Sequence, residues 1–116
     1  MTTPHIETVM ASPGLIMTIT SPLTHRCPFR DEVDEGTITV TWQTMNGTIE
    51  LHSLRAYFDS FAGSVISHES MTDMIRRELN RIPSVKALDV VTHWNTAGMD
   101  VACSTSLTPA ALRMAP

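Results

Sequence analysis

The chain has 116 residues, and its 8 lysines and arginines against 12 aspartates and glutamates give a formal net charge of −4. This balance argues against nucleic-acid binding through a basic surface. No apolar run reaches the roughly 20 residues that cross a bilayer. The length predicts one domain over residues 1–116. Because the first residues lack the features of a secretion signal, we expect a cytoplasmic protein with reduced cysteines.

The first half of the chain predicts extended structure. Residues 15–19 form an apolar run that we expect to be a short strand ended by Ser21-Pro22, and residues 23–35 read as an irregular polar connection. Residues 37–41 alternate strictly, which predicts a half-buried strand of an antiparallel sheet. Asn46-Gly47, within residues 45–48, then predicts a turn before a further extended stretch at 49–51.

The spacing of apolar residues then becomes helical. We expect a first helix with Ser53 as its N-cap and Gly63 as its stop, and a second helix closed by Pro83. The apolar face of the first helix carries Leu54, Tyr57, Phe58 and Phe61, and that of the second carries Met71, Met74, Ile75, Leu79 and Ile82.

Two more extended segments, 85–94 and 98–105, complete the pattern, and the tail from about residue 107 is predicted to be irregular. The order strand, strand, helix, helix, strand, strand predicts an α+β fold: a four-stranded antiparallel sheet with both helices on one face. Such a sheet leaves two exposed edges. Pairing of these edges between copies would close a barrel, so we expect a homo-oligomer.

Residues suited to covalent chemistry gather in the middle of the chain. Cys27 is followed by Pro28 and, seven residues on, by Asp34, and then come Glu50 and the pair His68-Glu69. A thiolate nucleophile, acids that move protons and polar anchors are what a covalent enzyme needs. Structural roles remain open for three of them. These are a buried thiol for Cys27, a residue at a strand start for Asp34, and an acid in the first turn of a helix for Glu69.

Three motifs in register resemble the tunnelling-fold enzymes, and among them the 7-cyano-7-deazaguanine reductases, which reduce a nitrile to a primary amine. The first is Cys27-Pro28 through Asp34, leading into a strand. The second is Glu50-Leu51-His52-Ser53-Leu54-Arg55 with the aromatic helix that follows, and the third is His68-Glu69. The resemblance implies a tunnelling fold over one domain that assembles into an oligomeric barrel of stacked rings with active sites at interfaces.

The resemblance also implies roles for individual residues. Cys27 attacks the nitrile as a thiolate, Asp34 supplies the proton, and His68 assists. Glu69 anchors the purine-like ring, with Glu50 as a second contact. The stretch His52, Ser53 and Arg55 corresponds to the segment that binds NADPH. The substrate is a 7-deazapurine, either as the free base or within a nucleic acid.

Departures from the family pattern keep a second reaction open. His52 stands where the family has lysine, Ala62 where it often has arginine, Ser67 where it has an aromatic residue, and the turn at 95–98 lacks arginine. A 2′-phosphate needs such cations. The alternatives are an archaeosine-type amidinotransferase, in which ammonia attacks the same thioimidate, and a non-catalytic 7-deazapurine-binding protein.

No metal site is expected from the sequence. His25 and Cys27 with Cys103 are residue types that bind zinc, but they lack the metal motif of the related cyclohydrolases. We expect Cys103 to be a structural residue on the strand face that also carries Met99 and Val101.

Overall fold

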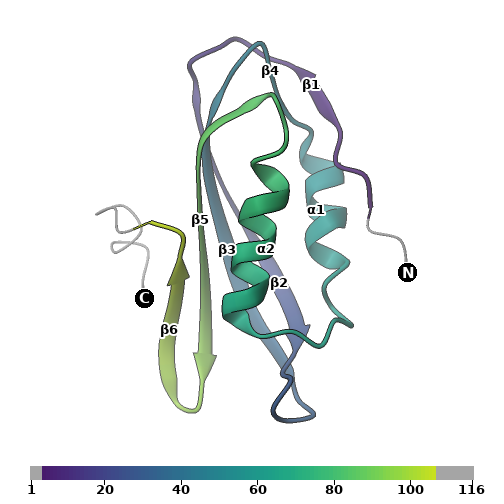
Figure 1. Cartoon of the computed structure of the whole chain (residues 1–116), viewed down its shortest axis with the longest axis vertical. Coiled ribbons are helices and arrows are strands. Elements are labelled where there is room, and N and C mark those ends of the chain that lie inside the picture. Colours follow the sequence, from purple (N-terminus) through teal and green to yellow (C-terminus); the bar gives the residue numbers. More distant parts are fainter. Residues whose placement is uncertain (1–3, 107–116) are drawn as a thin grey trace.

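The computed structural model describes residues 4–106, which form six strands and two helices (Figure 1). The tail from residue 107, predicted to be irregular, lies outside the described residues. The strands are β1 (Thr8–Met10), β2 (Ile16–Arg26), β3 (Val33–Thr44), β4 (Gly47–Ile49), β5 (Val85–Thr96) and β6 (Met99–Ser104), and the helices are α1 (Leu51–Asp59) and α2 (His68–Leu79).

The main sheet is antiparallel, with the strand order β2-β3-β5-β6. Both helices cover the same face of this sheet (Figure 1), which confirms the predicted α+β architecture. Ile38, Val40 and Trp42 alternate along β3 and are completely buried, as their spacing predicts. The helices contribute their apolar faces to the same core, which includes Leu54, Tyr57 and Phe58 of α1 and Met71, Ile75 and Leu79 of α2.

Strand β2 is much longer than the sequence predicts. Ser21-Pro22 does not end it, and pairing with β3 continues from Ile16 through Pro22 to Arg26. A proline lacks the N–H that a central strand must donate, but β2 is the outer strand of this sheet, where one side needs no donor. The irregular connection expected over 23–35 therefore shrinks to residues 27–32 between the two strands.

The chain turns at Asn46-Gly47 as predicted, but the turn does not join two paired strands. Gly47 does follow the end of β3 closely, but β4 turns away and pairs with the N-terminal strand β1, so that Thr8 lies opposite Ile49. An added Cβ at Gly47 would lie 2.8 Å from the Ser84 Oγ and 3.1 Å from the Val9 carbonyl oxygen. The glycine therefore serves close packing between β1 and the start of β5.

The helix boundaries differ from prediction at the first helix. Glu50, rather than Ser53, is the N-cap of α1, and its carboxylate accepts hydrogen bonds from the backbone N–H groups of His52 and Ser53. The N-cap of α2 is Ser67, whose Oγ accepts from the Ser70 N–H at 3.1 Å. Within residues 4–106, neither helix has the length and apolar character needed to cross a membrane.

Candidate active site

The turn between β2 and β3 positions Cys27 at one end of the sheet. Arg26 pairs with Val33 and His25 with Asp34, so these strands remain in register up to the loop. The Cys27 N–H donates to the Glu32 carbonyl at 2.9 Å, which closes the loop on itself. Because side chains alternate along a strand, Asp34 lies on the same face as buried Ile38, beneath the helices.

The segment before α2 runs alongside the end of β2. The Arg26 N–H donates to the Ser64 carbonyl at 2.9 Å, and the Ile66 N–H donates to the Arg26 carbonyl at 3.1 Å. This pairing brings the first turn of α2, with His68 and Glu69, beside Cys27. The result is a pocket of about 160 Å³ lined by His25, Cys27, Pro28, Phe29, Asp34, Ser67, His68, Glu69 and Thr96.

Four of the residues predicted for the site therefore come together in one chain: Cys27, Asp34, His68 and Glu69. The Nε2 atom of His68 lies 3.2 Å from the Asp34 Oδ2, within hydrogen-bond distance. Both side chains are largely buried, with 9% of His68 and 17% of Asp34 exposed. A carboxylic acid held by a histidine beside a cysteine is suited to proton transfer during nucleophilic addition.

A buried chain of hydrogen bonds holds His68 and the ring on which it stacks. The His68 imidazole and the Trp94 indole lie parallel, with centroids 4.3 Å apart and planes 2° apart. The Trp94 Nε1–H donates to the Thr92 Oγ1 at 2.9 Å, and the Thr72 and Thr92 hydroxyls are bonded at 2.7 Å. Because Thr72 donates its only hydroxyl proton to the His68 carbonyl, Thr92 must donate to Thr72. These bonds connect the Trp94 indole to the backbone of His68.

His25 is a site residue that the sequence analysis did not select. It is 1% exposed, and its ring packs edge-to-face against His68 and Trp94, with both centroid distances at 4.8 Å. Burial, and next the proximity of His68, lower the pKa of His25. Its Nε2 lies 3.6 Å from the Asp34 Oδ2. The donor atoms of His25, Asp34 and His68 all lie within 4.8 Å of one another, an arrangement that could hold a metal ion.

Phe29 is a second residue that motif spacing did not identify. It lines the pocket, yet 87% of it is exposed, which is unusual for an aromatic side chain of this size. Val33 and Val65 are also exposed, and they lie on either side of Arg26. Val33 pairs with Arg26 from β3, and Val65 forms a bridge to Arg26 from the segment before α2. The end of the molecule that carries the pocket therefore exposes several apolar side chains, next to the charged loop residues 30–32.

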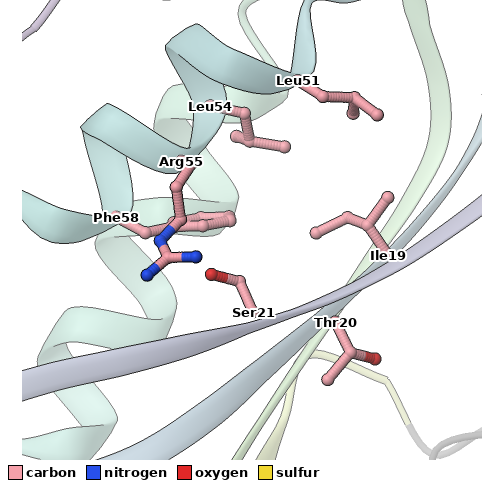
Figure 2. A pocket seen from close by; sticks show the side chains of 7 residues that line it. All are labelled: Ile19, Thr20, Ser21, Leu51, Leu54, Arg55 and Phe58. Atoms are coloured by element: carbon pink, nitrogen blue, oxygen red, sulfur yellow. The ribbon is translucent and has the colours of Figure 1, made fainter.

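The residues predicted to contact the cofactor lie elsewhere, at the start of α1. Figure 2 shows Arg55 beside a second pocket, of about 260 Å³, between α1 and the middle of β2. Ser21, on the β2 wall of this pocket, precedes Cys27 by six residues, or roughly 20 Å of extended strand. Arg55 Nε donates to the Asp59 carboxylate at 3.0 Å, and His52 is fully exposed and bonded to Glu50.

Glu50, predicted to contact substrate, does not line the pocket of Cys27. Its carboxylate caps α1 instead, and the N–H groups of His52 and Ser53 lower its pKa. The Ser53 hydroxyl is also engaged, since it donates to the Glu50 carbonyl and accepts from the Glu7 N–H. The structure of one chain thus gives these residues a helix-capping arrangement.

Cys103 is separated from Cys27 in the described part of the chain. It lines another pocket, with Glu69 and Thr72, and burial raises the pKa of its thiol. The trio considered from the sequence, His25 and Cys27 with Cys103, is therefore not a metal cluster; the histidine and aspartate donors described above are the ones that converge.

Comparisons with known proteins place the chain in a family. The model of a family described as QueF-like protein matches residues 34–108. The NADPH-dependent 7-cyano-7-deazaguanine reductase of Chlorobaculum parvum is 38% identical over 72 residues, which are 62% of each chain. The reductase of the same name from Chlorobaculum tepidum is 35% identical over 69% of this chain and 68% of its own length. This chain thus spans about two thirds of the length of these curated relatives.

A solved structure supports the fold independently. The crystal structure of the archaeosine synthase QueF-Like in the apo form superposes with a TM-score of 0.75, covering 85% of this chain and 100% of that chain at 17% identity. At this identity the likeness concerns the fold, and it confirms the tunnelling-fold architecture implied by the sequence motifs. With the match of the family model over residues 34–108, these findings show that the chain belongs to the QueF-like protein family.

Proposed function

We propose that this chain reduces the nitrile of 7-cyano-7-deazaguanine to an aminomethyl group with NADPH, through a covalent thioimidate on Cys27. The observation that carries the proposal is the pocket in which Cys27, Asp34, His68 and Glu69 meet. The family supports the choice of substrate, because relatives that are 35% and 38% identical carry the reductase name. The pocket supports the choice of reaction, because it joins a thiol to a hydrogen-bonded acid.

In the first step the Cys27 thiolate adds to the nitrile carbon. One carbon–sulfur bond forms, one carbon–nitrogen π bond breaks, and Asp34 gives a proton to the nitrogen. The His68 Nε2 lies 3.2 Å from the Asp34 Oδ2 and holds that oxygen in place. His68 can then pass a proton from solvent to Asp34, which restores the acid. The overall reduction then requires two hydrides and two protons, and the thiolate leaves again when the imine forms.

Glu69 is the proposed anchor of the substrate ring. A carboxylate accepts hydrogen bonds from adjacent ring N–H and exocyclic amino groups, and Glu69 lies in the first turn of α2, on the wall of the pocket. Phe29, on the same wall and largely exposed, offers an apolar face for stacking on the ring. The ring would then lie between an aromatic side chain and a polar anchor.

The start of α1 fits the phosphates of NADPH only in part. Each NADPH would supply one hydride when bound, so the reduction would use two molecules in succession. Figure 2 shows the Arg55 guanidinium directed toward the pocket between α1 and β2, where it can meet a phosphate. His52 adds a second basic group, but both side chains already contact acids of α1 or of its cap. We therefore assign phosphate binding to Arg55 first, with His52 and Ser53 as neighbours.

A specific observation favours a second candidate, the amidinotransferase. The archaeosine synthase structure has the same fold, and the basic residues at the start of α1 are few in this chain. In that reaction ammonia, rather than hydride, attacks the thioimidate carbon and Cys27 leaves, which yields an amidine. The steps at Cys27 and Asp34 are unchanged, and the base would be carried by a nucleic acid or be free.

Intact-protein mass spectrometry with 7-cyano-7-deazaguanine tests the shared step. We expect a mass increase equal to the ligand, absent in Cys27→Ala and retained in Cys103→Ala, the other free thiol. Asp34→Asn should slow adduct formation by about 10²- to 10⁴-fold, the usual contribution of a positioned acid. If the ligand binds without an adduct, the protein is a non-catalytic 7-deazapurine-binding protein and both enzymatic proposals are wrong.

The fate of the adduct separates the two reactions. Loss of NADPH absorbance in a 2:1 ratio to an aminomethyl product supports the reductase. Release of the adduct by ammonia alone, with an amidine product and no NADPH consumption, supports the amidinotransferase. Arg55→Ala tests the cofactor site separately from the pocket of Cys27. It should raise the KM for NADPH while the Cys27 adduct forms at the wild-type rate.

A further inference from the structure

We infer that His25, Asp34 and His68 form a binding site for one divalent transition-metal ion, of which Zn²⁺ is the best fit. The inference goes beyond the proposed function, in which Asp34 and His68 act on protons and His25 has no role. It rests on the convergence of three donor atoms in a buried position and on a ring nitrogen that the protein leaves without a hydrogen bond.

The spacing of the donors matches a metal site. The Asp34 Oδ2 lies 3.2 Å from the His68 Nε2 and 3.6 Å from the His25 Nε2. In a tetrahedral zinc site with bonds of about 2.0–2.2 Å, neighbouring ligand atoms are about 3.3 Å apart. The third pair, between the two histidines, is at most 4.8 Å apart. A shift of no more than about 1.5 Å in that pair would complete one face of a tetrahedron.

The tautomer of His25 prepares its Nε2 for a metal. The Nδ1 atom lies 3.2 Å from the Arg26 carbonyl oxygen, which can only accept, so Nδ1 carries the proton. The Nε2 lone pair is then directed toward Asp34, another acceptor, at 3.6 Å. Among the described residues this buried Nε2 has no hydrogen-bond partner. A cation between the two acceptors would satisfy both, and an N–H to carbonyl bond behind a ligating histidine is usual in metal sites.

The surroundings also suit a metal with an open position. Trp94 packs edge-to-face against His25 and stacks in parallel on His68, and the two imidazole rings also meet edge-to-face. The three donors lie at the wall of the pocket that Cys27 lines, so a fourth position would face a water or a small ligand. Two histidines and one carboxylate with an open position are a ligand set typical of zinc and iron(II) sites.

Metal binding has a chemical consequence for the proposed reaction. An ion on the Asp34 Oδ2 and the His68 Nε2 takes the lone pairs that would carry the proton to the nitrile. Zinc and proton donation by Asp34 therefore exclude each other. Saturation with Zn²⁺ should block formation of the Cys27 adduct, and a chelator should restore it.

The test of the site is a titration of the full, chelator-treated chain with Co²⁺, read by the visible absorption of tetrahedral cobalt, followed by displacement with Zn²⁺. We expect one equivalent to bind. His25→Ala and His25→Gln should each lower the affinity at least about 100-fold, because losing even a supporting residue around a metal costs 10- to 100-fold. His52→Ala, which removes a fully exposed histidine, should bind like the wild type. Circular dichroism establishes that each variant is folded.

The results separate this inference from the proposed function. No absorption band at up to 1:1 Co²⁺, or equal affinity in both folded His25 variants and the wild type, would overturn the metal site whatever the enzyme does. A band that survives in Cys27→Ala supports the three donors, because Cys27 is not among them, and a band lost there overturns the assignment. Absence of a nitrile adduct with and without Zn²⁺ would instead refute the proposed function and leave the cobalt result standing.

Discussion

Replacement of Gly36 by alanine should disturb both the sheet and the candidate site, because the indole of Trp94 lies directly against the glycine. A Cβ at this position would meet the Trp94 Cε3 at 2.4 Å and the Cζ3 at 2.8 Å. It would also lie 2.2 Å from the His93 carbonyl oxygen, on the neighbouring strand β5. The same indole stacks on His68, so a change at β3 reaches the residue that holds Asp34.

The size of the effect follows from these contacts. Ordinary contacts begin at about 3.4 Å, so the indole must move by about 1 Å and the sheet must open near the His93 carbonyl. Inserting a methyl group into a well-packed core usually costs about 1–3 kcal/mol. Since one of the opposing atoms belongs to the backbone and cannot rotate away, we expect about 3 kcal/mol. For a domain of this length that corresponds to a melting temperature roughly 10–20 °C lower.

Urea unfolding followed by circular dichroism measures this cost, with Gly63→Ala as the matched control. Gly63 has open space around its Cβ position and no positive φ, so its substitution should change the free energy of unfolding by less than about 0.5 kcal/mol. The Cys27 adduct should also form more slowly in Gly36→Ala, because the displaced Trp94 indole no longer stacks on His68. If the two variants have equal stability, Trp94 does not pack against β3 at Gly36.

Three further changes test other parts of the structure. Glu50→Ala should lower the melting temperature by a few degrees through loss of the α1 cap, without changing the rate of adduct formation. Thr72→Val should cost about 1–3 kcal/mol in urea unfolding, because it leaves the buried Thr92 hydroxyl without its acceptor and removes the side-chain bond to the His68 carbonyl. The pKa values of His25 and His93 are lowered by burial from 6.5. Above pH 6.5 these histidines are neutral in the folded and in the unfolded chain. Below it the unfolded chain takes up protons first, which favours unfolding. Urea titrations in the presence of a chelator should therefore show the free energy of unfolding falling from pH 7 to pH 5.

Periodicity predicted the sheet and the helices because both depend on a simple pattern of apolar residues. The extent of β2 was missed for a physical reason: the rule that proline ends a strand applies to strands bonded on both sides. Pro22 lies in an outer strand, where its missing N–H has no consequence within this chain. The pairing of β4 with β1 was missed because Asn-Gly favours a turn but does not determine which strand the chain then meets.

The site was predictable as far as its motifs extend. Cys27, Asp34, His68 and Glu69 were identified by their order in the chain, and one pocket collects them. His25 was missed together with the end of β2, because its place opposite Asp34 depends on pairing of β2 with β3 as far as residue 26. Trp94 offered no sequence signal: its contact with His68 depends on how α2 packs across β5, which no local pattern describes.

The choice between reduction and amidine formation depends on a different part of the molecule from the pocket. Both reactions need the thiol and the acid at the end of the β2–β3 hairpin, so those residues cannot discriminate between them. We propose that the start of α1 discriminates between them; there Arg55 is engaged with Asp59 and His52 with Glu50. A phosphate there must compete with a carboxylate of the same chain for each cation. Because both contacts are exposed they are weak, and a phosphate of greater charge can replace the carboxylate. Under the proposed function, the number of charges at α1, rather than the chemistry at Cys27, would therefore decide whether a hydride donor can be used.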